Sequence, residues 1–168
     1  MATPGVGQSL IERYAKTRSE RLFRGDDGES VLLRDSALGH FPVYMSARGS
    51  SPDLVTLRAR WSARCAHTER FRLHECVNRF NVRNALLMAS VHESHDFSAL
   101  AVVGNSRFWV RDEDDFRPFA RFVDMSVASA TKLFEDVYAE ITRAVCASRK
   151  RSSLSSPAEL ERCFQLSG

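Results

Sequence analysis

Apolar residues recur every three or four positions near the start of the chain, and this spacing predicts an amphipathic helix over residues 8–22. The apolar stripe consists of Leu10, Ile11, Tyr14 and Leu22. Ser9 and Glu12 have the spacing of a capping box, which satisfies free N–H groups in the first turn of a helix. Residues 24–30, with the sequence RGDDGES, are rich in turn-forming side chains and predict a loop.

Three segments rich in β-branched and aromatic residues follow, separated by short turn-forming stretches. Their sequences are ESVLLRD, HFPVYMSARG and DLVTLRARWS. In the third segment apolar and polar side chains alternate, and the apolar phase contains Val55, Leu57, Ala59 and Trp61. A period of two is typical of a strand with one buried face. These segments therefore predict antiparallel strands joined by short turns.

The helical spacing returns after residue 67 and predicts a second helix over residues 68–83. Its apolar positions are Leu73, Cys76, Val77 and Phe80. Thr68 fits the N-cap, and Asn84 fits the C-terminal end, where asparagine tolerates the left-handed conformation. Residues 85–110 predict two or three more strands, with ESHD and GNS as turns.

The last long helix is predicted over about residues 126–147, with Ser126 as its N-cap, because one apolar stripe runs through this region. Pro118 is expected to interrupt any helix across the preceding segment RDEDDFRPFARFVD. SRKRSSLSS then predicts a basic linker. In SPAELERCF, Ser156, Pro157 and Glu159 occupy positions typical of the first turn of a short terminal helix.

The order of elements is a helix, strands, a helix, strands and a final helix. Strands grouped between helices favour the α+β class, with an antiparallel β-sheet of about five or six strands packed against helices. A chain of 168 residues fits one hydrophobic core. We therefore expect a single domain over residues 1–147, followed by the basic linker and short helix in residues 148–168.

Charge is balanced along the chain, with 24 basic and 21 acidic residues and a net charge of +3. This balance provides no large cationic field for nucleic acid. The sequence has no secretory leader and no run of about 18 apolar residues. Its four cysteines form no CxxC pair. These features favour a cytoplasmic protein that does not insert into a membrane.

Three clusters resemble metal sites, but none has the spacing that such a site needs. The first contains Cys65, His67, His74 and Cys76. Its ligand pairs are separated by one residue, whereas zinc ligands usually lie farther apart in sequence. HESH (residues 92–95) has no third ligand nearby, and RDEDD (residues 111–115) lacks the pattern of a calcium loop. Because the common catalytic motifs are also missing, we expect no enzyme activity, no catalytic residue, no metal and no cofactor, and a metal-dependent enzyme is the least favoured alternative.

Two kinds of binding function remain. RNA or DNA is the less favoured partner, and it would contact arginines and aromatic side chains on the sheet and middle helix. These residues are Arg58, Arg60, Arg64, Arg72, Arg79, Arg83, Trp61, Phe108 and Trp109. Binding of a protein client is favoured, because apolar side chains recur on elements near the C-terminus. The candidate partner-binding residues are Phe116, Phe119, Phe122, Leu160 and Phe164.

The helix RFRLHECVNRFNVRN, the strands after it and the segment SVASATKLFEDVYAEI resemble the YbjN family of bacterial proteins, described as sensory transduction regulators. The resemblance covers about residues 41–147. Its signature is matched by Asn78, Arg79, Phe80 and Asn81, with phenylalanine where the family usually has tryptophan. The resemblance implies a fold similar to type III secretion chaperones. It also implies a cytoplasmic, non-enzymatic homodimer that binds or regulates other proteins.

The signature itself is expected to have a structural role. Phe80 continues the apolar stripe of the helix. At least one of Asn78 and Asn81 is expected to bond to the backbone of a neighbouring segment, because buried polar groups need partners. Such a bond would fix the end of the helix before the next strand.

Overall fold

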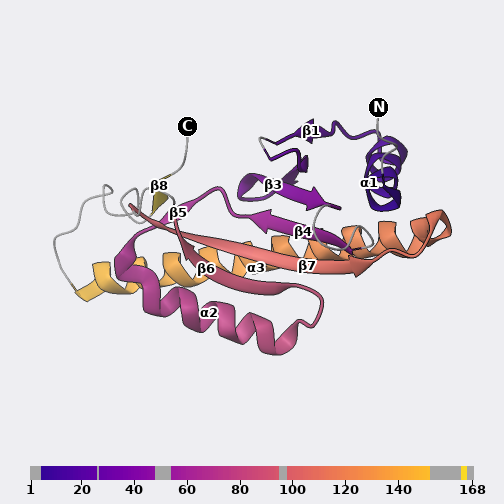
Figure 1. Cartoon of the computed structure of the whole chain (residues 1–168). Coiled ribbons are helices and arrows are strands. Elements are labelled where there is room, and N and C mark those ends of the chain that lie inside the picture. Colours follow the sequence, from indigo (N-terminus) through magenta and orange to yellow (C-terminus); the bar gives the residue numbers. More distant parts are fainter. Residues whose placement is uncertain (1–4, 26, 48–53, 95–97, 152–163, 166–168) are drawn as a thin grey trace.

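The computed structural model describes residues 5–25, 27–47, 54–94, 98–151 and 164–165. The helices are α1 (Val6–Thr17), α2 (Arg70–Arg83) and α3 (Phe116–Arg151), with 3₁₀ turns η1 (His67–Glu69) and η2 (Glu113–Asp115) (Figure 1). The strands are β1 (Phe23–Arg24), β2 (Ser30–Ser36), β3 (Gly39–Ser46), β4 (Leu54–Arg60), β5 (Arg64–Cys65), β6 (Met88–Glu93), β7 (Leu100–Trp109) and β8 (Phe164–Gln165). The predicted α+β class is confirmed.

One antiparallel sheet contains all the strands of the described residues. Their order is β1-β2-β3-β4-β7-β5-β8, with β6 also paired to β7. The strands of six residues or more are β2, β3, β4, β6 and β7. These strands account for the five or six that the sequence predicts. β1, β5 and β8 have two residues each, too few to produce a periodic pattern.

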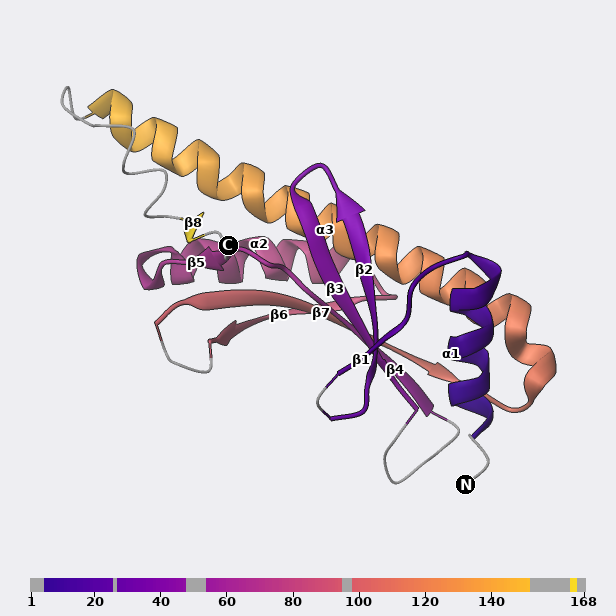
Figure 2. The same ribbon diagram turned by 90° about the horizontal axis from the view of Figure 1, so that it is seen from above.

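The helices lie on one face of the sheet (Figures 1 and 2). Phe134 of α3 packs edge-on against Phe41 of β3, with 5.1 Å between ring centroids, and stacks on Trp61 at 6.2 Å. Tyr14 of α1 packs edge-on against Phe119 of α3 at 6.4 Å. An antiparallel sheet permits this arrangement because its second face can remain in water. The core therefore lies between the sheet and a single helical layer.

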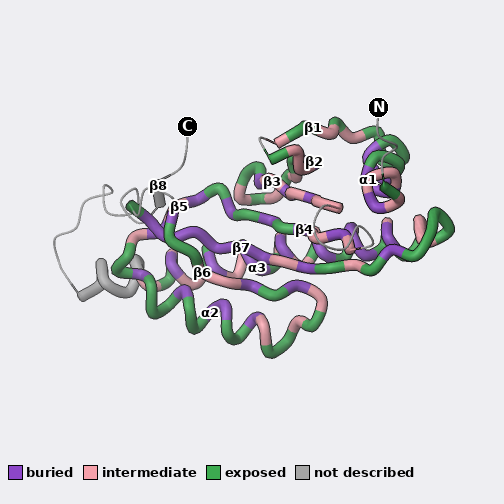
Figure 3. Tube along the Cα trace, in the orientation of Figure 1, coloured by how far each residue is buried: buried purple, intermediate pink, exposed green. Residues whose placement is uncertain are grey.

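The alternation predicted for β4 is confirmed. Val55, Leu57 and Ala59 are buried toward the helices, whereas Arg58 and Arg60 are exposed on the other face. In Figure 3, buried positions likewise concentrate where strands and helices face each other. Burial against the helical layer therefore produces the period of two in this strand.

α1 differs from the prediction at both ends. Gly5 is its N-cap, and the N–H of Ser9 donates to the carbonyl of Gly5 at 3.1 Å, so Ser9 lies inside the helix. No capping box forms, and Glu12 pairs with Arg24 instead, at 3.0 Å. The helix ends before residue 22 because the chain turns at Ser19, whose φ of 54° is incompatible with a right-handed helix.

α2 confirms the predicted apolar stripe, although its ends differ from the prediction. Its buried residues are Leu73, Cys76, Val77 and Phe80. Glu69, at the end of η1, takes the N-cap position predicted for Thr68. Asn84 has an extended backbone, with φ −129°, in place of the predicted left-handed one. Its side-chain oxygen accepts hydrogen bonds from the N–H groups of Leu86 and Leu87 at 3.1 and 3.0 Å, so the side chain makes the turn.

β7 continues through residues 104–106, where the sequence GNS predicts a turn. Gly104 has a packing role within the strand, since a Cβ atom there would lie 2.6 Å from Cδ2 of Leu87. Leu87 is fully buried and packs directly onto the backbone of β7. The glycine therefore marks a close approach of a side chain to a strand rather than a chain reversal.

α3 begins earlier than predicted, because Pro118 falls in its first turn, where proline costs no intrahelical hydrogen bond. Ser126 is therefore not an N-cap. It is fully buried inside α3 and accepts a hydrogen bond from the hydroxyl of Ser106 in β7, with 3.0 Å between the two oxygens. The helix also continues through residues 148–151, where the sequence predicts the start of a linker.

Candidate interaction surface

The asparagine signature joins α2 to β6. Asn81 donates from Nδ2 to the carbonyl of Ala89 at 2.9 Å and accepts at Oδ1 from the N–H of Ala89 at 2.7 Å. The predicted bond to a neighbouring segment is confirmed for Asn81. Asn78 is exposed, and Phe80 is buried in the core. Asn81 of the signature therefore has a structural role, because it connects α2 to β6.

The candidate partner-binding phenylalanines of α3 are largely internal. Phe119 and Phe122 are 0% and 7% exposed and pack against Phe108 in the core. The prediction that these two offer surface to a partner is wrong, because the early start of α3 places them on its buried stripe. Phe116 is partly buried, with the guanidinium carbon of Arg13 4.1 Å from its ring centroid.

The other two candidate partner-binding residues belong to the C-terminal tail. Leu160 lies outside the described residues, as does most of the predicted terminal helix. Phe164 lies in β8 and pairs with Cys65 of β5. The predicted terminal helix therefore does not extend to Phe164, and this part of the tail returns to the sheet of its own chain.

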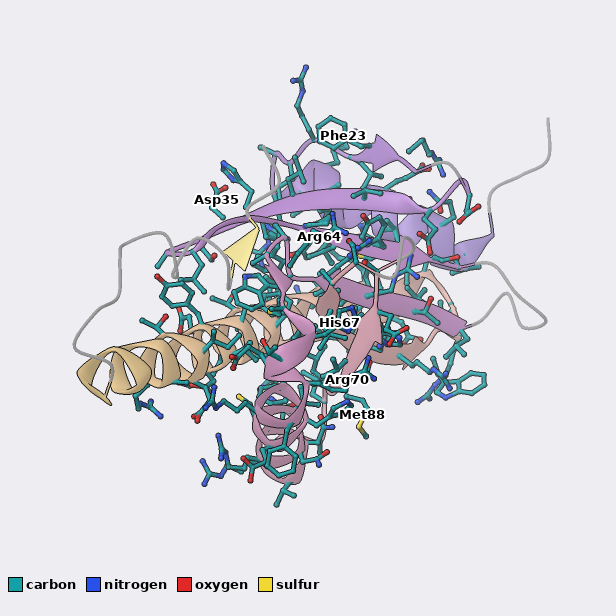
Figure 4. All side chains as sticks on the ribbon, turned by 90° about the vertical axis from the view of Figure 1, so that its left-hand side faces the viewer. Phe23, Asp35, Arg64, His67, Arg70 and Met88 are labelled. Atoms are coloured by element: carbon teal, nitrogen blue, oxygen red, sulfur yellow. The ribbon has the colours of Figure 1, made fainter. Side chains whose placement is uncertain are left out.

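The cysteine and histidine cluster is spread over different environments. Cys65 and Cys76 are buried, whereas His67 and His74 are exposed. Figure 4 shows His67 beside Arg70 at the start of α2. Burial raises the pKa of the Cys76 thiol. Across the part of the chain that the structure describes, no group of three or more His, Cys, Asp or Glu residues is arranged to hold a metal ion.

Several large apolar side chains are exposed on the face of the sheet that no described helix covers. The exposed ones on strands are Phe23 (45%), Leu33 (56%), Met88 (62%) and Trp109 (67%). The strand registers place all four on the same side as Tyr44 and Arg58, since opposite residues of antiparallel strands share a face. We call this side the uncovered face. In Figure 4, Phe23 and Met88 mark two widely separated points on it.

A hollow of about 440 Å³ lies on the uncovered face. Within it the Arg58 guanidinium carbon lies 4.9 Å from the ring centroid of Tyr44, and Arg58 donates to Glu29 at 3.0 Å. Arg60 and Asn105 line the same hollow. The uncovered face thus combines exposed apolar side chains with charged and amide groups.

The residues that would bind nucleic acid are divided by the fold. Trp61 is 5% exposed and stacks on α3, and Phe108 packs against the phenylalanines of α3. The interpretation that Trp61 and Phe108 stack on bases is therefore wrong. Arg58, Arg60 and Trp109 of this set lie on the uncovered face.

Sequence reasoning did not identify Phe23, Leu33, Met88 and Trp109 as a candidate protein-binding surface, although a signal for it was present. Met88 and Trp109 occupy the phase of their strands that points away from the helices. A large apolar side chain in that phase does not contribute to the core, and several such residues on adjacent strands indicate a contact surface.

The fold and this surface define an α+β protein whose antiparallel sheet carries helices on one face and exposed apolar residues on the other. The structure is similar to the crystal structure of YbjN from E. coli, "a putative transcription regulator". The TM-score is 0.62 at 12% sequence identity, over 82% of this chain and 93% of that chain. At this identity the likeness shows the fold alone, so the YbjN-like fold is confirmed and family membership stays a prediction.

Comparisons of the sequence itself add no relative. No family model and no curated protein sequence matches the chain. Among the described residues, no helix is both long and apolar enough to cross a membrane.

Proposed function

We propose that residues 1–147 act as a single non-enzymatic domain that binds a protein client through the uncovered face, in a chaperone-like or regulatory role. The observation that carries this proposal is the placement of four large exposed apolar side chains on one face. They are Phe23, Leu33, Met88 and Trp109. Large apolar residues exposed on one face are typical of interaction sites, because a partner removes them from water.

The chemistry of the uncovered face fits a protein partner. Tryptophan, phenylalanine and methionine are enriched in protein interfaces, where they supply apolar contact area. Arg58, stacked over Tyr44, holds a planar set of donors at the surface for carbonyl or carboxylate groups of the client. The apolar residues would supply affinity, and the hollow would supply polar contacts that select the client.

Affinity purification from the native host, with the wild-type chain and the Trp109→Arg variant as bait, tests this proposal. The variant places a charge among the apolar side chains and should lose a reproducible protein client. Phe71→Arg is the matched control, because Phe71 is a 75% exposed aromatic residue on α2, within the helical layer. Circular dichroism checks that both variants are folded. A client retained by Trp109→Arg, or lost equally from both variants, contradicts the proposal.

Homodimer formation remains a prediction from the family resemblance and the surplus of exposed apolar surface. A dimer would have twice the 19.0 kDa mass of the chain. Light scattering at high micromolar protein concentration measures this directly. A mass equal to one chain at every concentration would reject the dimer without affecting the proposal for client binding.

Nucleic-acid binding is the second candidate, and one observation favours it. Arg58, Arg60 and Arg107 share the uncovered face with Trp109. An exposed tryptophan among arginines suits a single strand, because the ring stacks on a base while the cations contact phosphates. Nuclease treatment during the same purification separates the two candidates. Partners that depend on intact RNA or DNA would favour nucleic acid over a protein client.

A further inference from the structure

The helical layer contains a groove between α2 and α3, remote from the uncovered face. Its volume is about 670 Å³, within the range of sites for small molecules. Its apolar lining comes from Cys76, Phe80 and Ala139. Its cationic lining comes from Arg79, Arg83, Lys132 and Arg143. We call this feature the helix groove.

The charges of the helix groove do not cancel. Among the residues that the structure describes, four cationic side chains line it against two carboxylates, those of Asp136 and Glu140. This leaves an excess of two positive charges, in a chain whose whole formal charge is +3. A net excess of positive charge around a concave surface raises the local concentration of anionic ligands. The helix groove is therefore suited to an anion.

Glu140 holds two of these cations together. Arg79 Nη2 and Arg143 Nη1 donate to the same carboxylate oxygen, Oε2 of Glu140, at 3.0 and 3.1 Å. Because Arg79 lies on α2 and Arg143 on α3, this oxygen brings guanidinium groups from both walls to one point. Each guanidinium has several N–H donors, more than one shared oxygen can satisfy. The pair is thus preorganised for a second anion.

The other two cations add charge at the same groove. Lys132 Nζ donates to Asp136 at 2.7 Å, and this hydrogen bond raises the pKa of Lys132, so the amine stays protonated. Arg83 is exposed in the last turn of α2 and has no ion pair within the described residues. An incoming anion can therefore contact Arg83 without displacing a carboxylate.

We propose that the helix groove binds a small phosphate-bearing molecule through Arg79, Arg83 and Arg143. Arginine forks match phosphate oxygens with two parallel hydrogen bonds, and lysine binds phosphate as a point charge. A small molecule fits better than a nucleic-acid strand, because Phe80, the one aromatic residue among the described lining residues, is buried and offers no ring for base stacking. This site is separate from the client surface proposed above.

Isothermal titration calorimetry of the full chain with pyrophosphate and with ATP, at matched ionic strength, tests the assignment. We expect one saturable site per chain. Arg83→Gln should weaken binding about tenfold, the effect of losing one charge-assisted hydrogen bond. Ala139→Glu should abolish binding, because it adds a carboxylate to the groove without removing a donor. The controls Arg117→Gln and Ala128→Glu make the same changes at exposed positions of α3 outside the groove and should leave the affinity unchanged.

Three results would overturn the assignment. The first is no saturable binding of either probe. The second is an equal loss of affinity in the groove and control variants, which would mean general electrostatic attraction. The third is a single-stranded oligonucleotide that binds far more tightly than pyrophosphate and also depends on Arg83, which would make nucleic acid the ligand. None of them bears on the uncovered face, which is tested with Trp109→Arg.

Discussion

Asn81 and Ala89 form a closed pair of hydrogen bonds across the junction between α2 and β6. The side-chain amide makes the two hydrogen bonds that a neighbouring strand would make, because it donates to the carbonyl of Ala89 at 2.9 Å and accepts from its N–H at 2.7 Å. Ala89 is 4% exposed, so water has little access to either backbone group. The Asn81 side chain therefore provides hydrogen-bond partners for both backbone groups of Ala89 and fixes the position of α2 beside β6.

Replacing Asn81 with alanine should destabilise the protein. Both backbone groups of Ala89 would lose their partner, at a cost of about 1–3 kcal/mol. A loss of this size lowers the melting temperature of a protein this large by several degrees. Thermal and urea denaturation measure the change. Asn78→Ala is the matched control, since Asn78 is exposed on the same helix. Equal melting temperatures for the wild type and Asn81→Ala would contradict the structural role.

Gly104→Ala should destabilise the protein, because β7 and the side chain of Leu87 are in close contact at this position. The added Cβ would lie 2.6 Å from Leu87 Cδ2, so the substitution should cost about 1–3 kcal/mol through overpacking. Leu87→Ala is also destabilising, because it leaves a cavity. In the double variant the smaller side chain makes room for the new methyl group, so the combined loss of stability should be less than the sum of the two. Strict additivity in urea denaturation would count against this contact.

The buried hydroxyls of Ser106 and Ser126 should show the same kind of coupling. Their 3.0 Å hydrogen bond joins β7 to the interior of α3. Either single alanine variant leaves one buried hydroxyl without its partner and should cost about 1 kcal/mol. The double variant removes both polar groups and should be more stable than the sum of the single losses implies. A double-mutant cycle by chemical denaturation supplies the coupling energy, and a value of zero would refute the pairing.

The spacing of apolar residues correctly predicted the elements that bury one face in the core between the sheet and the helices. Val55, Leu57 and Ala59 repeat every two residues because β4 has one covered face, and the stripe of α2 repeats at helical intervals for the same reason. Local signals were less reliable. Proline and glycine commonly interrupt secondary structure. Yet Pro118 lies in the first turn of α3, and Gly104 lies within β7 beneath the side chain of Leu87. The role of Pro118 depends on where α3 begins, and the role of Gly104 depends on how Leu87 packs against β7. Local composition encodes neither.

The surfaces were harder to predict than the fold. Phe119 and Phe122 have the spacing of either a core stripe or a docking stripe, and only the start of α3 decides between them. The helix groove brings Arg79 together with Arg143 through a shared carboxylate, although they are 64 positions apart in sequence. Spacing along the chain cannot report such convergence, because it depends on how α2 packs against α3.

Tyr14 links three elements through its hydroxyl group. It donates to Oδ1 of Asp124 in α3 at 2.7 Å and accepts from Nη2 of Arg34 in β2 at 2.8 Å. Burial, followed by the hydrogen bond to Asp124, raises the pKa of Tyr14 from 10.0 to about 12. The folded protein therefore holds the phenolic proton more tightly than the unfolded chain does.

The contribution of the Tyr14 hydroxyl to the free energy of unfolding should therefore change with pH in the alkaline range. It is complete below the unfolded pKa of 10.0 and is lost as the pH rises from there through the folded pKa of about 12. Tyr14→Phe keeps the ring against Phe119 but removes the hydroxyl, so below pH 10 it should lower stability by about 1 kcal/mol. The gap between the two proteins should then narrow as the pH approaches 12, because only the wild type has this proton to lose on unfolding. Urea denaturation of both proteins over a pH series measures the gap, and the other tyrosines cancel in the comparison. A gap that stays constant over the whole series would show that folding does not shift the pKa of Tyr14.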